Sequence, residues 1–477
     1  MALAPLLLLP YSLESQALSA TTSERIHGTA PYLTIDGGVT KVTEIKELLG
    51  IKLSDGRTFT PQNNPSSSTA PIELSNVGDT FADIEMIVPP SSDSIDINDL
   101  VTQGKWGDDD GDGQGADGVT ASGSISLVIK DKDGNTVNRS DALDICKAPY
   151  KVTLDSSGGT LETRYGMPNS STFSGGIAEY YITPPSYPVI CSVRPNLHGG
   201  KRDWENLGPP SIWNIDKGFL TVFTNPSSYG QNFPTTGADG LYFDLDIGGI
   251  DASQLSWTVN TSGDISATVS WTKPRTGIVK SPNGPMAPAD IWISDKSQNV
   301  TRVTLNGPEA RSQWDNPSPS QITVPSLPQT FELVGRDSQG NEVRYGFVLR
   351  QWFVNRGGKE DNHSNQTTWC NSLGYRMPRV RDLTNAVCSG YLSGSLCQGA
   401  VGATPSSSGN HYQRNIGAGF LTEWGDVGFY SDADFVWSYY WTSDVAARYW
   451  FTVYFNNGNV GSYSDTISDQ YAVCTTP

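Results

Sequence analysis

Residues 369–385 read WCNSLGYRMPRVRDLTN and contain residue types that commonly end one helix and begin the next. Gln366–Leu373 is long enough for about two helical turns. Gly374 is the residue type that most often ends a helix in a left-handed conformation. Pro378 fits the first turn of a second helix that runs through Leu383. The segment therefore predicts a compact two-helix element, and it is the most distinctive helical signal in the chain.

The charged residues of this segment are open to two interpretations. They could form an active-site cluster, or they could be the salt-bridged and solvated start of the second helix. The residues concerned are Arg376, Arg379, Arg381 and Asp382. We favour the structural interpretation, because charged side chains at a helix start are commonly solvated or paired.

The composition of the chain favours β-rich domains with many turns. The 477 residues are 36% hydrophobic and 17% charged, and they include 49 Gly and 30 Pro. Aromatic residues are plentiful enough to build packed cores. The formal net charge of −18 should repel nucleic acid and anionic membranes. We therefore expect no nucleic-acid partner.

Two similar turn sequences predict two related β-sandwich units. Ser124–Lys130 alternates and runs into Asp-Lys-Asp-Gly-Asn, and Thr330–Arg336 runs into Asp-Ser-Gln-Gly-Asn. Each is typical of a strand that enters a tight hairpin turn. Further strands are expected at Gly240–Ile247, Ile265–Trp271 and Val300–Leu305.

The N-terminus resembles a secretory signal in composition. Ala2–Pro10 is a short apolar run, followed by small residues suited to cleavage. The alternative is an ordinary buried N-terminal segment. No later run is long enough for a transmembrane helix. The expected organisation is a signal peptide at 1–20, an N-terminal segment and linker at 21–69, β-sandwich domains at 70–205 and 206–349, and a final domain at 350–477.

Six cysteines, an even number, favour disulfide bonds in a chain that is expected to be exported. Six cysteines allow 15 connectivities, but their clustering favours one. The predicted pairs are Cys146–Cys191, Cys388–Cys397 and Cys370–Cys474. A metal site is the weaker alternative, because no CxxC or Cys/His spacing occurs.

The final 128 residues or so resemble the bacterial C-type-lectin-like fold. The residues that carry this resemblance are Trp369-Cys370, Leu373-Gly374, Arg376-Met377-Pro378, Leu383, Tyr440-Trp441-Thr442-Ser443 and Cys474. The resemblance covers roughly 350–477. It implies an α+β domain with two short helices first, and strands and long loops after them.

A larger part of the chain, roughly 70–477, resembles the adhesion region of the intimin/invasin family. The resemblance rests on Trp106–Gly113 (WGDDDGDG), the Cys146 and Cys191 pair, and the final lectin-like region. It implies a mainly β fold, with immunoglobulin-like β-sandwich domains followed by a C-terminal C-type-lectin-like α+β domain. It also implies a secreted or surface location on a Gram-negative bacterium, and attachment to host cells.

An Asp-rich loop in 108–119 is a candidate structural Ca²⁺ site. Its alternating carboxylates, followed by Gly113, match the start of an EF-hand loop, but Val119 stands where that loop requires a bidentate Glu. The candidate ligands are Asp108, Asp110, Asp112 and Asp117. The alternative is a solvated Asp/Gly turn.

The ligand surface of the last domain is expected to be aromatic. Region 350–477 lacks the Glu-Pro-Asn, Gln-Pro-Asp and Trp-Asn-Asp triplets with which C-type lectins hold Ca²⁺ and sugar. Exposed Trp and Tyr residues in a long loop region are typical interface anchors. The candidates are Trp424, Phe429, Tyr430, Trp437 and Tyr439. The alternative is that these loop residues pack on themselves.

The sequence favours a binding protein over an enzyme. The four His residues are isolated, and no HExxH, Gly-x-Ser-x-Gly or Walker-type motif is present. We expect an adhesin that binds a host cell-surface protein or glycan and requires no cofactor other than a structural Ca²⁺. The alternatives are a self-associating structural protein and, less favoured, a glycan hydrolase that uses two carboxylates.

Overall fold

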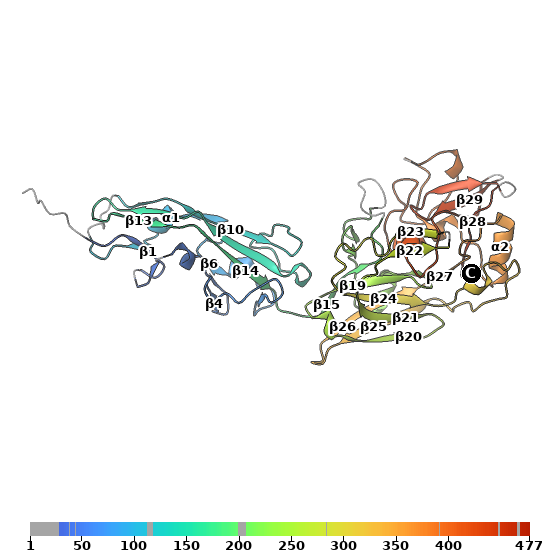
Figure 1. Ribbon diagram of the computed structural model, residues 1–477, viewed down its shortest axis with the longest axis horizontal. Coiled ribbons are helices and arrows are strands. Elements are labelled where there is room, and N and C mark those ends of the chain that lie inside the picture. The colour runs from blue at the N-terminus through green and yellow to red at the C-terminus, as the bar shows by residue number, and fades with distance from the viewer. Residues whose placement is uncertain are drawn as a thin grey trace, which may run out of the picture. The chain divides into compact units, whose positions relative to one another are not determined.

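The computed structural model describes residues 28–37, 39–42, 44–111, 118–198, 207–282, 284–390, 392–446, 449–464 and 468–477. The chain divides into two compact units, Met1–Pro185 and Ser186–Pro477 (Figure 1). The predicted signal peptide at 1–20 lies outside the described residues. Among the residues described, no helix has the length and apolar character needed to cross a bilayer.

The first unit is built from small sheets around one core. Its largest sheet is antiparallel except for one edge pair, and has the order β5 (Ile72–Glu73), β14 (Gly176–Thr183), β11 (Tyr150–Ser156), β10 (Ser124–Lys130) and β7 (Ser94–Asp96). The three smaller sheets are β13 (Ser170–Phe173), β12 (Gly159–Glu162) and β9 (Thr120–Ala121); β2 (Lys41–Val42), β1 (Tyr32–Thr34) and β8 (Trp106–Gly107); and β4 (Thr58–Phe59), β3 (Ile51–Lys52) and β6 (Glu85–Met86). The helical turns are η1 (Ile45–Leu48), η2 (Phe81–Asp83), α1 (Ile97–Thr102) and η3 (Ile145–Lys147).

Alternation along the strands explains which side of the large sheet is buried. In β10, Ile125, Leu127 and Ile129 point into the core, while the residues between them are at least partly exposed. Leu127 pairs with the buried Leu154 of β11. This is the period-2 pattern of a sheet with one buried face.

The predicted N-terminal segment and linker are integral parts of the first unit. Leu33, Leu49 and Ile51 belong to its core. Within the predicted linker, Asn64 Nδ2 donates to the Glu179 carbonyl at 2.7 Å, and Ser66 Oγ accepts from Tyr181 N at 3.0 Å. These bonds fasten the Ser/Pro-rich stretch to β14, so it does not behave as a free linker.

The second unit begins with a β-sandwich. The six-stranded sheet has the order β16 (Trp213–Asn214), β17 (Gly218–Phe219), β15 (Val189–Arg194), β19 (Tyr242–Gly248), β24 (Val300–Asn306) and β21 (Ser266–Thr272). The facing sheet contains β20 (Ser256–Thr261), β25 (Gln329–Arg336) and β26 (Glu342–Leu349), and a separate hairpin joins β22 (Ile278–Ser281) to β23 (Gly284–Pro288). The mainly β class predicted from the sequence, with β-sandwich units, is confirmed.

Aromatic side chains join the two sheets of this sandwich. Phe331 and Phe347 stack in the small sheet with ring centroids 4.7 Å apart, and Phe243 of the large sheet meets Phe347 edge-on at 5.9 Å. All three rings are almost completely buried. Edge and stacked ring pairs of this kind stabilise a core beyond the area they bury.

The two predicted turns have the same construction. Asp131 Oδ1 accepts from Asp133 N and Asn135 N, and Asp337 Oδ1 accepts from the backbone N–H groups at the equivalent positions, Gln339 and Asn341. The glycine of each turn has a positive φ, 87° for Gly134 and 90° for Gly340. The second turn joins β25 to β26 as predicted. The first turn does not lead into a paired strand among the described residues. Only an isolated β-bridge, between Lys130 and Thr136, follows it, because β10 pairs mainly with β7 and β11.

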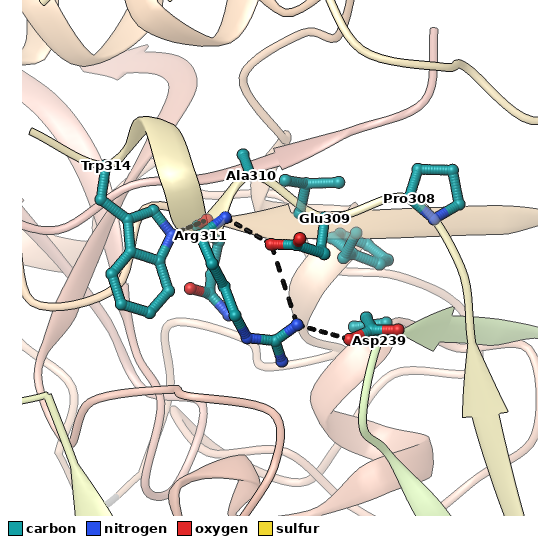
Figure 2. Close-up of a pocket in the computed structure, with 10 residues that line it drawn as sticks. Asp239, Pro308, Glu309, Ala310, Arg311 and Trp314 are labelled. Carbon is teal, nitrogen blue, oxygen red and sulfur yellow. Dashed lines mark hydrogen bonds and ion pairs between the residues drawn. The ribbon is translucent and has the colours of Figure 1, made fainter. Parts of the chain in front are cut away.

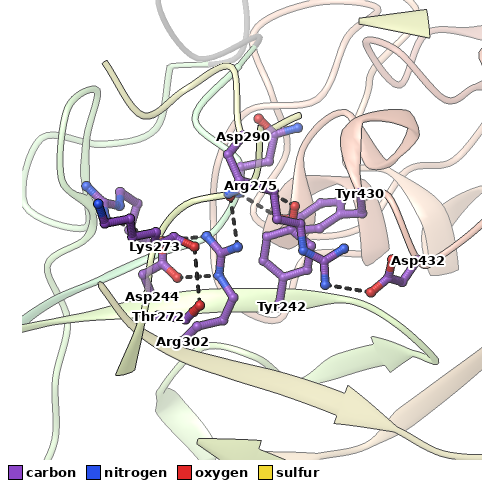
Figure 3. A network of polar contacts seen from close by, with 11 residues as sticks. Tyr242, Asp244, Thr272, Lys273, Arg275, Asp290, Arg302, Tyr430 and Asp432 are labelled. Atoms are coloured by element: carbon purple, nitrogen blue, oxygen red, sulfur yellow. Dashed lines mark hydrogen bonds and ion pairs between the residues drawn. The ribbon is translucent and has the colours of Figure 1, made fainter. Parts of the chain in front are cut away.

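A buried ionic network ties the sandwich to the loops that follow it (Figure 3). The Arg302 guanidinium lies between two carboxylates, Asp244 at 2.8 Å and Asp290 at 2.8 Å. Tyr242 packs its ring 4.2 Å from that guanidinium and donates its hydroxyl to Asp290. Arg275 extends the network by an ion pair to Asp432 at 2.5 Å. All of these charged groups are paired, so the network holds the fold together.

The remainder of the second unit closes on the sandwich through a small mixed sheet. β27 (Gln351–Asn355) runs parallel to β18 (Thr236–Ala238) and antiparallel to β31 (Val473–Thr475). Between β27 and β31 lie α2 (His363–Ser372), α3 (Val380–Leu383), α4 (Phe420–Trp424) and the antiparallel sheet β28 (Tyr439–Ala446), β29 (Tyr449–Tyr454) and β30 (Val460–Tyr463). Further helical turns of this unit are η4 (Pro226–Gln231), η5 (Ala252–Gln254), η6 (Arg311–Gln313), η7 (Ser395–Cys397) and η8 (Val427–Phe429).

The two-helix element forms close to where the sequence predicts it. α2 is capped by Asn362, whose side-chain oxygen accepts from Asn365 N at 2.9 Å, and Gly374 with φ of 90° follows its last turn. Trp369 and Cys370 of α2 are buried. The second helix is only one turn long and starts at Val380, two residues after the expected Pro378.

The disulfides expected in this region are present. Cys370 of α2 is bonded to Cys474 of β31, and Cys388 to Cys397. Cys146 and Cys191 are also disulfide-bonded. Their pairing with each other stays a prediction, because the two residues belong to different units.

The division of the chain differs from the expected domain boundaries. The boundary drawn between residues 205 and 206 falls inside the second unit, whose sheet already includes β15. The boundary at 349 and 350 separates β26 from β27, yet residues on both sides belong to one hydrophobic core. Patterns of turns and prolines mark where strands end, and they do not show which strands share a core.

Candidate binding surface

Three of the five aromatic residues predicted to bind a ligand are buried, and this corrects the prediction. Trp424, Phe429 and Tyr430 have relative exposures of 0%, 2% and 1%. α4 and the turn after it fold back on the sandwich, where Trp424 meets Phe233 at 4.8 Å and Tyr430 meets Tyr242 at 5.0 Å. These rings belong to the core of the second unit, so they cannot contact a ligand directly.

The other two predicted residues, Trp437 and Tyr439, are half-buried at the edge of that core. Trp437 packs edge-on against Phe429 with centroids 4.8 Å apart, and its indole Nε1 donates to Asp426 Oδ1 at 2.6 Å. Trp437 is thus anchored while part of its ring stays accessible. Tyr439 begins β28.

Tyr439 belongs to a set of half-buried rings on one face of the β28–β29–β30 sheet. We call this set the aromatic sheet face; its members are Tyr439, Trp450, Tyr454 and Tyr463. Tyr439 pairs with Tyr454 across the strands, with ring centroids 4.8 Å apart, and meets Tyr463 at 5.5 Å. Trp450 pairs with Tyr463. Each of the three strands, β28, β29 and β30, therefore contributes at least one ring to the aromatic sheet face.

The opposite face of the same sheet is core. Phe451, Val453 and Phe455 of this hairpin are at most 2% exposed, and Tyr440 stacks on Phe455 with centroids 3.7 Å apart. A strand places alternate side chains on opposite faces. Burial of Phe451, Val453 and Phe455 therefore places Trp450 and Tyr454 on the other face, where both are half-buried and Thr452 between them is completely buried.

A histidine supports the aromatic sheet face from α2. The His363 ring stacks on Trp450 with centroids 3.7 Å apart and an interplanar angle of 11°. His363 Nε2 lies 3.0 Å from the Thr442 carbonyl oxygen, which fixes the ring in place. Trp450 is thereby held in one orientation, and a fixed aromatic side chain loses little conformational entropy when a partner binds.

The sequence left open which residues of this strand face outward. From the sequence, either of two alternating sets could be the buried one: Tyr449, Phe451, Val453 and Phe455, or Trp450, Thr452 and Tyr454. The more apolar set is buried, apart from Tyr449 at the strand end, which is 45% exposed; in the other set Thr452 is also buried, and only Trp450 and Tyr454 are partly exposed. Comparing the hydrophobicity of the two sets was the available signal for finding Trp450 and Tyr454.

A small cavity in the same unit is too small for a ligand (Figure 2). It has a volume of about 10 Å³ and is lined by Trp314, Arg311 and residues near them. That volume holds about one water molecule. Arg311 Nη1 forms an ion pair with Asp239 at 2.6 Å, and its Nε forms another with Asp434 at 2.6 Å, so the charges around the cavity are already paired.

The predicted Ca²⁺ site is only partly within the described residues. Asp112 and Asp117 lie outside them. Asp108 Oδ1 accepts from Thr29 Oγ1 at 3.4 Å, and Asp110 Oδ2 accepts from Thr29 N at 2.5 Å. No group of three or more metal-ligating side chains occurs in the part of the chain that the structure describes. Calcium binding stays a prediction.

Comparisons with known proteins give similarities at the level of structure. No protein-family description and no curated protein matches the sequence. The structure is similar to invasin, a bacterial integrin-binding protein, at 12% identity over 76% of this chain and 52% of that chain, with a TM-score of 0.33. The chain thus spans about half the length of that invasin structure.

The structure is also similar to the C-terminal fragment of intimin solved with the intimin-binding domain of its translocated receptor, Tir. The identity is 10% over 75% of this chain and 93% of that chain, with a TM-score of 0.31. SGBP-B of the Bacteroides ovatus mixed-linkage glucan utilization locus, solved with a mixed-linkage heptasaccharide, matches at 11% identity over 49% of this chain and 37% of that chain, with a TM-score of 0.14.

Proposed function

We propose that this protein is an extracellular bacterial adhesin, without enzymatic activity, that binds a host-surface protein or glycan through the aromatic sheet face. The observation that carries the proposal is the group of half-buried rings, Tyr439, Trp450, Tyr454 and Tyr463, held in place by cross-strand pairing. Tyrosine and tryptophan supply large contact areas at low entropic cost and are enriched at binding hot spots.

We also propose that Gln351–Pro477 is a C-type-lectin-like region. The support is its order of elements: a first strand, two short helices, long loops that include the short helix α4, a three-stranded sheet, and a last strand that returns beside the first. The Cys370–Cys474 bond between the first helix and the last strand supports the same proposal. In this arrangement the aromatic sheet face lies on the inserted sheet.

The disulfides support an extracellular location. All cysteines among the described residues are bonded, and none is free. Thiols stay reduced in the cytosol and oxidise in exported proteins. Invasin binds integrin and intimin binds Tir, as their structures state. The proposal for this chain rests on its own aromatic surface, and its receptor is to be found by experiment.

The test is binding of the full-length oxidised protein to epithelial cells by flow cytometry. We expect saturable binding that excess unlabelled protein displaces, and that Tyr454→Ser weakens at least ten-fold. Tyr165→Ser is the matched control, because Tyr165 is an exposed tyrosine of the first unit. Circular dichroism must show both variants folded. Tyr454→Phe keeps the ring packing and should retain most of the binding.

Absence of saturable binding to cells would overturn the proposal, and so would equal binding by the wild-type and Tyr454→Ser proteins. The self-association alternative has its own measurement in the same samples. Analytical ultracentrifugation that shows concentration-dependent oligomers, lost in Tyr454→Ser, would assign the aromatic sheet face to a second copy of the chain instead of a host receptor.

A further inference from the structure

The second unit has an open cleft, and none of its lining residues belongs to the aromatic sheet face. It has a volume of about 320 Å³, within the range of small-ligand sites. Five separate segments converge on it: the start of β18, the junction of β26 and β27, α3, the loop at 403–404, and the turn before α4. The lining residues are Thr235, Thr236, Arg350, Gln351, Arg381, Asp382, Ala403, Thr404, Gly417 and Gly419.

One wall of the cleft is built on a buried carboxylate. Glu423 of α4 is completely buried and accepts hydrogen bonds from the backbone N–H and the hydroxyl of both Thr235 and Thr236, at 2.6–3.1 Å. It also accepts from Gly417 N at 2.9 Å. Three lining residues are thereby fixed by a single side chain. A wall that is already ordered loses little entropy when a ligand binds.

The hydrogen bonds to Glu423 also set what this wall can offer a ligand. Thr235 and Thr236 each donate their hydroxyl hydrogen to the carboxylate, at 2.8 Å and 2.6 Å. A hydroxyl has one hydrogen to donate and two lone pairs. The two threonine oxygens can therefore only accept from a ligand, and the natural partner is a ligand hydroxyl group.

The charges that the cleft offers are positive. Arg350 and Arg381 are both exposed, and Arg350 donates one hydrogen bond to the Gly230 carbonyl at 3.1 Å. Within the described part of the chain, the Arg381 side chain makes no hydrogen bond or ion pair. Two unneutralised guanidinium groups in one cleft are unusual on a protein of net charge −18.

The one acidic residue among those lining the cleft is already neutralised. Asp382 accepts from Arg376 Nη1 at 2.7 Å and from Arg379 N at 2.7 Å. The sequence interpretation of these residues as a paired helix start fits Arg376 and Asp382, and it misses the position of Arg381 at the cleft. A single paired carboxylate does not supply the acid and base of a glycan hydrolase.

From these features we propose that the cleft binds a carboxylated sugar, with Arg381 and Arg350 pairing with the carboxylate and the threonine wall accepting from the sugar hydroxyls. Guanidinium groups match the planar carboxylate in paired hydrogen bonds. The remaining lining groups are an amide, a third hydroxyl, glycines and one alanine. No aromatic or large aliphatic side chain is among them, which favours a hydroxyl-rich sugar over a peptide side chain.

The inference goes beyond the aromatic sheet face and does not depend on it. The test is isothermal titration of the full-length oxidised protein with the methyl glycosides of N-acetylneuraminic acid and glucuronic acid. The methyl esters of the same sugars are the neutral controls. We expect at least one acid to bind, and its ester to bind at least ten-fold more weakly.

Variants of single arginines distinguish binding in the cleft from a general attraction of the acid to positive charge on the protein. Arg381→Gln and Arg350→Gln should each weaken binding of the acid at least ten-fold. Arg379→Gln is the matched control, because Arg379 is exposed on the same turn and is not among the residues that line the cleft. We expect it to bind like wild type. These arginines are exposed, so the variants should fold, and thermal unfolding checks this.

The inference would be overturned by no binding of either acid, by equal binding of acid and ester, or by unchanged binding by Arg381→Gln. Acetate that binds as tightly as the sugars would also overturn it, because the site would then recognise the anion alone. Cell binding by the Tyr454→Ser variant is measured separately, so failure of the cleft proposal is distinct from failure of the adhesin proposal.

Discussion

The indole of Trp437 donates a 2.6 Å hydrogen bond to the carboxyl group of Asp426, a residue that is completely buried. Asn456 Nδ2, in the turn after β29, donates to the other oxygen of the same carboxyl at 2.7 Å. One side chain thus links the loop that carries Trp437 to the sheet that carries the aromatic sheet face. Burial raises the pKa of Asp426 to about 8, although these hydrogen bonds act in the opposite direction.

The raised pKa of Asp426 predicts a specific dependence of stability on pH. The pKa in the unfolded chain is near the ordinary value of 3.8, so between pH 4 and 8 the folded state binds more protons than the unfolded state. The contribution of Asp426 to stability is therefore fully present below pH 4 and is lost as the pH rises through 8. The slope from this one group is at most about 1.4 kcal/mol per pH unit.

Comparison with Asp426→Asn isolates this effect, because asparagine can accept the Trp437 hydrogen bond and does not titrate. Chemical unfolding at pH 5, 6, 7 and 8 should show wild-type stability falling relative to that of Asp426→Asn as the pH rises. A constant difference between the two proteins across this range would show that the pKa of Asp426 is not raised.

The two described disulfides should differ in their contribution to stability. Cys370–Cys474 joins residues 104 apart in sequence, and Cys388–Cys397 joins residues 9 apart. On the chain-entropy relation, removal costs about 4–5 kcal/mol for the long loop and about 2–3 kcal/mol for the short one. Denaturant unfolding of the Cys370→Ser/Cys474→Ser and Cys388→Ser/Cys397→Ser variants measures both values. The reverse order would contradict the prediction.

Arg302 should be among the most sensitive charged residues of the second unit. Arg302→Met leaves the buried carboxylates of Asp244 and Asp290 without their shared cation, and we expect a loss of about 3–5 kcal/mol. Arg344→Met is the control, since Arg344 pairs with glutamates at the surface and its side chain is 45% exposed. Its loss should be about 0–1 kcal/mol, as for other surface ion pairs.

The shared core predicts that the second unit folds as one piece. A fragment of residues 186–477, with Cys191→Ser, should unfold cooperatively and disperse its amide NMR signals. A fragment of 350–477 should not, because it loses the partners of buried indoles. Trp352 Nε1 donates to the Pro308 carbonyl and Trp369 Nε1 to the Gln313 carbonyl, both outside that fragment. A well-dispersed spectrum from the shorter fragment would show an independent domain.

Local features of this fold were predictable from the sequence. The α2 region, its terminal glycine, the strand at 124–130, the hairpin turn after 336 and two disulfides all follow from turn chemistry, alternation or cysteine spacing. Each of these signals is carried by residues near one another in sequence, or by a rare residue type.

The burial of Trp424 and Tyr430 could not be predicted in this way. Their partners, Phe233 and Tyr242, lie almost two hundred residues earlier, in the sandwich. A loop rich in aromatic residues has the same sequence whether it meets solvent or a distant core. For the same reason the cleft was missed: the segments of Thr235, Arg350 and Arg381 meet only in the folded chain.

The pairing of β27 with β31 has a consequence for the order of events during synthesis. Val354 pairs with Cys474, about 120 residues later, so the sheet that closes the second unit is incomplete until β31 has left the ribosome. Contacts so distant in sequence form slowly, because a long loop must close first. The sheet that closes the second unit is therefore expected to form late, after the strands of the sandwich have paired.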